Sequence, residues 1–115
     1  MFLTLLALAG IGISTDVSAK EYVVSGAYLA SACEAVPVQH PTANESLRSA
    51  VCLSYIEGFT DADHTECSAV SYQKMASVYV AYMKEHPEMM KMPKSVGLSI
   101  ALRQTYPCRI QSPTK

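Results

Sequence analysis

The chain has 115 residues, half of them apolar, with 17% charged residues and a formal net charge of −1. A chain of this length has room for one domain built around a single core. Neither sign of charge dominates and no run of like charge occurs, which argues against nucleic acid and anionic lipid as partners. A partner would have to be recognised by shape and local polarity.

The first segment of the chain is typical of a secretion signal. Residues 1–13 carry no charge and are mostly apolar, but they are too few to span a bilayer as a permanent anchor. Small residues at the positions that signal peptidase recognises place the cleavage after Ala19, so 1–19 is the expected signal peptide and 20–115 the mature domain. The mature chain then has no membrane segment. The alternative is a buried N-terminal helix.

Export to an oxidising compartment favours pairing of the four cysteines, which are Cys33, Cys52, Cys67 and Cys108. Two disulfides would each add about 2 to 4 kcal/mol to a domain whose small size limits its core. The cysteines lack the close CxxC spacing that zinc sites usually show, and paired thiols cannot act as nucleophiles. We therefore expect no metal site, no cofactor and no catalytic cysteine.

The first half of the mature chain predicts two helices. The Ala- and Leu-rich stretch 26–33 indicates a short helix that ends before two prolines. Thr42 and Glu45 match a capping box, so a second helix should begin there. Gly58 interrupts this helix, and we expect it to allow close packing against another backbone. The apolar stripe of the second helix recurs every four positions, at Leu47, Val51, Tyr55 and Phe59.

The second half predicts two more helices. A third helix should run from Ser71 to the residue before Pro87, because its apolar residues follow three-four spacing. It is apolar around much of its circumference, so it lies centrally or contributes to a dimer interface. Ser95 is expected to cap a fourth helix that ends at Pro107. No stretch alternates with period two, so the expected fold is all-α, a small disulfide-stapled bundle of about four helices.

The order of the helices favours one pairing of the cysteines. Antiparallel neighbours would place Cys67, before the third helix, and Cys108, after the fourth, at the same end of the bundle. Cys33 would then pair with Cys52 across the proline-containing connection. The other two connectivities stay open, because the sequence does not exclude them.

Polar side chains gather where the second helix ends, including Glu57. They could serve acid-base chemistry or hold a metal, but polar residues crowd most helix ends because the chain turns through solvent there, so we expect no catalytic residue. Exposed loops on a rigid scaffold commonly carry recognition, which favours this turn and the connection after the third helix. The predicted partner contacts are Asp61, Asp63, His64, Glu66, Glu88, Met89, Met90 and Lys91. For the methionines, core packing is the competing role.

Taken in order, these segments resemble the Rap/Tai family, the periplasmic immunity proteins that protect Gram-negative bacteria from type VI secretion amidase effectors. The matching landmarks are GAYLASAC (26–33), VCLSYIEGFTD (51–61), Cys67, YMKEHPE (82–88) and ALRQTYPC (101–108). The resemblance implies a helical, often dimeric protein that binds the amidase and keeps peptidoglycan out of its cleft, which needs no catalytic group. One departure precedes the third helix, where family members often have Phe-Cys-x-Pro and this chain has ECSA.

Three classes of function follow from these features. The leading hypothesis is a periplasmic immunity protein that binds and inhibits a peptidoglycan amidase effector, with homodimerisation implied by the resemblance. The alternative is a periplasmic acid-stress chaperone or another small secreted helical binding protein, since such proteins share the size, the helices and the disulfides. An enzyme that uses the polar cluster at the end of the second helix is the least favoured class.

Overall fold

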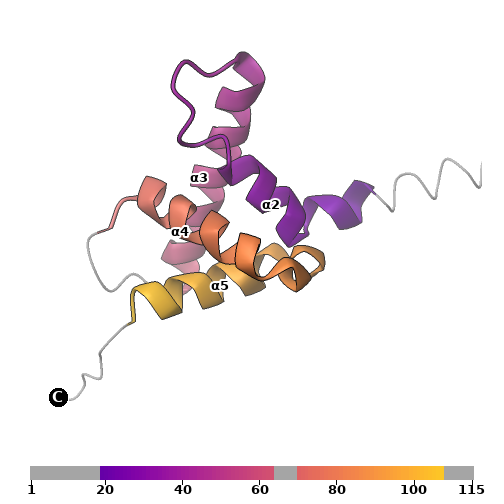
Figure 1. The fold of residues 1–115 in the computed structure, drawn as a ribbon, viewed down its shortest axis with the longest axis vertical. Coiled ribbons are helices and arrows are strands. Elements are labelled where there is room, and N and C mark those ends of the chain that lie inside the picture. Colours follow the sequence, from indigo (N-terminus) through magenta and orange to yellow (C-terminus); the bar gives the residue numbers. More distant parts are fainter. Residues whose placement is uncertain (1–18, 64–69, 108–115) are drawn as a thin grey trace, which may run out of the picture.

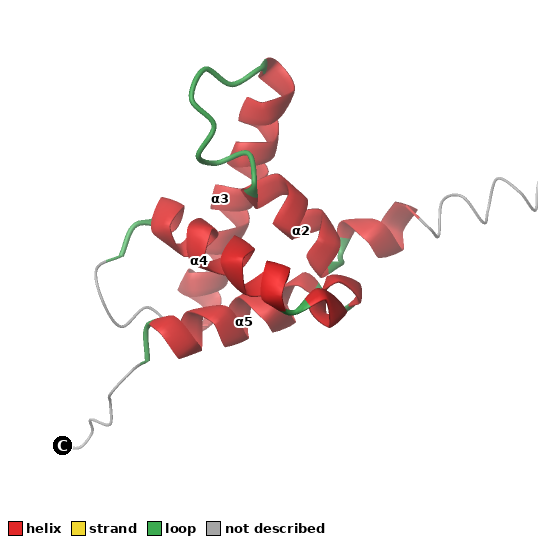
Figure 2. Cartoon of the chain, viewed as in Figure 1, coloured by secondary structure: helices red, strands yellow, loops and turns green. Residues whose placement is uncertain are grey.

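The structure of the protein is a computed structural model that describes residues 19–63 and 70–107. The named elements are α2 (Gly26–Cys33), α3 (Ala43–Asp63), α4 (Tyr72–Glu85), the 3-10 helix η1 (Pro87–Lys91) and α5 (Lys94–Thr105). A further helical turn covers residues 19–23. The described residues form no strand beyond one isolated bridge between Ser25 and Pro93 (Figure 2). The predicted all-α fold is therefore confirmed.

Three helices enclose the core together with part of α3. Helices α4 and α5 lie side by side and run antiparallel, with η1 reversing the chain between them (Figure 1). Helix α2 contacts both of them as well as α3 and η1. The largest fully buried side chains come from all four α-helices, and they are Leu29, Cys33, Cys52, Ile56, Tyr79, Met83 and Leu98.

Tyr79 places α4 at the centre of the bundle, one of the two positions expected for the third helix. Its side chain is fully buried, and its hydroxyl donates a hydrogen bond to the backbone carbonyl of Gly26 at 3.2 Å. Burial, together with the nearby Tyr55, raises the pKa of Tyr79 well above its ordinary value. The hydroxyl therefore stays protonated and keeps joining α4 to the start of α2.

Side-chain caps begin three of the helices. The predicted capping box of α3 is present: the amide of Glu45 donates to Thr42 Oγ1 at 3.1 Å, and the amide of Thr42 donates to Glu45 Oε1 at 2.9 Å. Ser25 and Ser71 accept hydrogen bonds from the first turns of α2 and α4. The predicted cap at Ser95 is wrong, because α5 already begins at Lys94 and has no side-chain cap.

The side chain of Lys94 joins the N-terminal segment to the bundle. Its Nζ atom lies 4.8 Å from the ring centre of Tyr55 and 5.6 Å from that of Tyr28. The same atom donates to the backbone carbonyl of Val23 at 3.2 Å, and the Lys94 amide donates to the carbonyl of Val24 at 2.9 Å. Cation–π contacts and hydrogen bonds from one residue thus connect α2, α3, α5 and the segment before α2.

The glycines correct one expectation. A Cβ atom added at Gly58 would meet nothing within 4 Å, so the predicted close backbone packing there is wrong. Close packing occurs instead at Gly26, where a Cβ atom would lie 2.5 Å from the backbone oxygen of Met89. Gly58 stood out in the sequence because glycine is unusual inside a helix. The need for glycine at position 26 instead arises from a contact with η1, which is distant in sequence.

A disulfide joins Cys33, the last residue of α2, to Cys52 in α3, with 5.0 Å between their Cα atoms. This is the pair expected across the proline-containing connection. Cys67 and Cys108 lie outside the described residues, so their expected pairing stays a prediction.

The first half of α3 projects beyond the bundle (Figure 1). None of the residues 43–51, here named the arm, is buried, and the Leu47 side chain is 65% exposed. The expected apolar stripe of this helix is therefore not covered at its first member. Burial along α3 begins at Cys52 and continues at Ile56 and Thr60.

Candidate functional site

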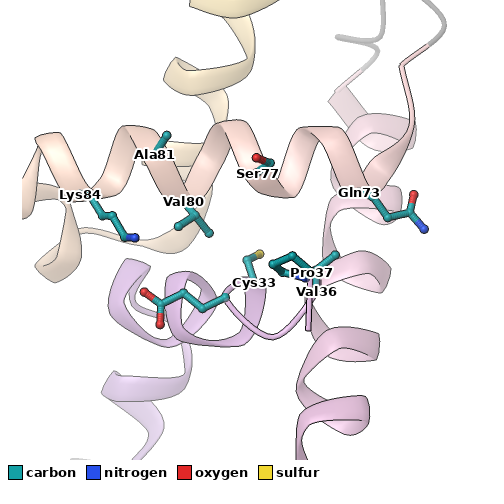
Figure 3. A pocket seen from close by; sticks show the side chains of 9 residues that line it. Cys33, Val36, Pro37, Gln73, Ser77, Val80, Ala81 and Lys84 are labelled. Atoms are coloured by element: carbon teal, nitrogen blue, oxygen red, sulfur yellow. The ribbon is translucent and has the colours of Figure 1, made fainter. Parts of the chain in front are cut away.

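A groove of about 500 Å³ lies between the end of α2 and the outer face of α4 (Figure 3). One wall comes from the end of α2 and the turn after it, and the other from one face of α4. The lining residues are Cys33, Glu34, Val36, Pro37, Gln73, Ser77, Val80, Ala81 and Lys84. This feature is named the α2–α4 groove below.

The groove combines an apolar interior with polar ends. Val36, Pro37 and Val80 face one another across it, and Lys84 and Gln73 lie toward its two ends (Figure 3). Glu34 also lines the groove. Apolar surface bordered by a carboxylate and an ammonium group is suited to burying a side chain of another protein. Within the described residues, no three His, Cys, Asp or Glu side chains come together as a metal site would require.

The local sequence explains both walls. The α4 residues recur at three-four spacing, which puts them on a single helix face, and Ser77 and Ala81 leave that face hollow because their side chains are small. The other wall exists because α2 ends at Cys33 and the chain then turns over residues 34–37, the last of which is the exposed Pro37. The groove was not predictable from the sequence pattern, since small residues on an exposed helix face do not stand out from other surface residues.

The predicted contacts at the end of α3 are described in part. Asp61 is exposed in the last turn of α3, and Glu57 is exposed one turn earlier. Asp63 is the last residue of α3. His64 and Glu66 lie outside the described residues. Among the described residues, Glu57 and Asp61 thus lie one turn apart on α3, and no three His, Cys, Asp or Glu side chains gather there as a metal site would require.

The predicted contacts after α4 lie on η1. Glu88 and Lys91 are exposed, whereas Met89 and Met90 are half-buried and pack against the core. The methionines thus contribute to core packing, and their predicted contact with a partner stays a prediction. Figure 1 places η1 beyond the end of α4 and the end of α3 toward the start of α4. Among the described residues, the two predicted segments therefore lie toward opposite ends of α4.

A family model described as Rap1a immunity proteins matches residues 25–108. The chain belongs to the Rap1a immunity protein family. The matched range begins at the cap of α2 and includes every named helix through α5. No curated protein and no solved structure matches the chain.

Membership of the Rap1a family indicates an immunity protein that binds a bacterial effector and acts without catalysis of its own. Both walls of the α2–α4 groove and both segments of predicted contacts fall inside the matched range. None of the helices in the described residues is both long enough and apolar enough to cross a membrane.

Proposed function

We propose that this Rap1a-family protein acts in the periplasm, where it binds and inhibits a peptidoglycan amidase delivered by a type VI secretion system. Inhibition protects the producing cell from its own effector and from that of its siblings. The observation that carries the proposal is the family match over 25–108, which includes every named helix. The signal-like residues 1–19 and the disulfide between Cys33 and Cys52 support an exported location.

Inhibition of this kind needs a surface and no reaction. Peptidoglycan is an extended polymer, so a protein bound across the amidase cleft blocks substrate entry by occupying its path. We propose that the α2–α4 groove takes up an apolar side chain of the amidase beside Val80, with Glu34 and Lys84 fixing the orientation. The predicted contacts on η1 and at the end of α3 would then lie around this central contact.

The test of inhibition begins with the genes next to that of this protein, among which the proposal expects one for a peptidoglycan amidase. The mature chain is titrated against that enzyme while the release of peptides from purified peptidoglycan is followed. We expect the activity to disappear near equimolar inhibitor. The amidase assignment is ruled out if the enzyme does not bind the chain and stays fully active in the presence of excess chain.

The role of the groove is tested by filling it. Ala81 is exposed on α4 and lines the groove, so Ala81→Arg should leave the fold intact and weaken amidase binding by more than about tenfold. The matched control is Ala50→Arg, an exposed alanine on the arm, which should bind normally. Equal binding by both variants in calorimetric titration would exclude the groove as the contact while leaving inhibition itself intact.

A further inference from the structure

The disulfide is part of the groove. Cys33 is 1% exposed and Cys52 is fully buried, and Cys33 lines the α2–α4 groove opposite Val80 (Figure 3). The bond therefore attaches the wall that ends α2 to α3. Because the other wall belongs to α4, the width of the groove depends on how firmly the end of α2 is held.

The turn after α2 moves with α2. Its backbone hydrogen bonds run back into the helix end: the amide of Ala35 donates to the carbonyl of Ala32, and the amide of Val36 donates to that of Cys33, both at 3.1 Å. The Val38 amide in turn donates to the carbonyl of Ala35. Any displacement of the end of α2 is therefore passed on to the groove residues that follow it.

Besides packing in the core, side-chain hydrogen bonds and a covalent bond hold the end of α2 to α3. Arg48 of the arm donates to the backbone carbonyl and the hydroxyl of Ser31. One turn further along α3, Cys52 forms the disulfide with Cys33. Helix α2 has eight residues, a length at which an isolated helix is unstable in water. Closing a loop between cysteines 19 positions apart favours the folded arrangement by on the order of 100-fold.

We propose that oxidation of Cys33 and Cys52 switches on effector binding, so that the chain is a weak binder in the reducing cytosol and becomes competent after export. This inference rests on the proposed function. In the reduced chain the end of α2 and the following turn detach from α3, and the groove loses one wall. The device links inhibition to the compartment in which the amidase substrate is found.

The redox step is a thiol–disulfide exchange with an external protein disulfide or glutathione disulfide. The thiolate of one cysteine attacks that disulfide and releases a thiol, and the thiolate of the other cysteine then displaces the second thiol from the mixed disulfide. The chain loses two protons and two electrons per bond formed. The external disulfide accepts the electrons and becomes two thiols.

The test compares amidase binding by the mature chain before and after reduction with dithiothreitol, and after re-oxidation with glutathione disulfide. We expect the Kd to rise at least about tenfold on reduction and to return on re-oxidation. The reductant acts on all four cysteines, so two double variants separate them. Cys67→Ala with Cys108→Ala should keep the redox response, whereas Cys33→Ala with Cys52→Ala should bind weakly in both buffers.

A second measurement needs no effector. Amide hydrogen exchange across α2 should become on the order of 100-fold faster on reduction. Equal Kd values in both buffers would overturn the switch and leave the proposed function standing. Absence of binding in both buffers would contradict the proposed function, and unchanged exchange in α2 would then also overturn the switch.

Discussion

The two halves of α3 form one continuous helix, but different forces hold them. The second half contributes Cys52, Ile56 and Thr60 to the buried interior, while the arm has no buried residue. The arm is instead closed by its capping box and attached to α2 through Arg48. Burial thus stabilises the second half, whereas the arm is held by its capping box, by the Arg48 hydrogen bonds to α2 and by partial burial of Val51.

The buried half of α3 lowers the free-energy cost of forming the helical arm. Helix nucleation is the unfavourable step, and each residue added to an existing helix costs little. Since the second half of α3 is fixed by packing against α2 and α4, the arm extends from a nucleus that already exists. Small local contributions are then enough to keep it helical outside the bundle.

The largest expected effect comes from truncating the buried half. Ile56→Ala should lower the free energy of unfolding by about 3 kcal/mol, because the side chain is fully buried and its loss leaves a cavity. Leu47→Ala, the same kind of truncation on the arm, should change it by less than about 0.5 kcal/mol. Urea unfolding measures both values. Similar losses for the two variants would mean that the arm is covered in solution.

An intermediate effect is expected at the tip of the arm. Thr42→Ala removes the hydroxyl that accepts from the amide of Glu45, which should cost about 1 kcal/mol. Hydrogen exchange should quicken in the arm and stay unchanged around Ile56, since the second half is held by packing. Uniformly faster exchange along α3 would show that its halves unfold together. Thr42→Ser, which keeps the hydroxyl, is the control.

The starts of α3 and α4 were predictable from sequence because local side-chain chemistry sets them, whereas α5 starts without a side-chain cap, before the predicted Ser95. Thr42 and Glu45 indicated the start of α3, and their side chains accept hydrogen bonds from each other's backbone amides. Ser71 indicated the start of α4, and its side chain accepts from the amide of Lys74. The all-α class followed from the three-four spacing of apolar residues and needed no tertiary information. The same spacing, however, treated the exposed Leu47 like the other three members of its stripe, which are half-buried and pack against the core.

The candidate site was not predictable in the same way. The α2–α4 groove depends on the small size of Ser77 and Ala81 and on a turn some forty residues earlier in the chain. Likewise, nothing near Gly26 in sequence indicates that the backbone of Met89 will approach it. Contacts between distant segments determine both features, and a single sequence carries no direct record of them.

The smallest expected change in stability tests whether the two halves of α3 are equally helical. Gly58 is exposed within the second half and has open space around its α-carbon, so Gly58→Ala should raise the free energy of unfolding by about 0.5 to 1 kcal/mol. The corresponding rise in Tm is about 4 °C for a domain of this size. Ala50→Gly on the arm should lower stability by a similar amount if the arm is as fully helical. A loss smaller than the gain at Gly58 would show that the arm frays, and a lower Tm for Gly58→Ala would reveal a contact on that face.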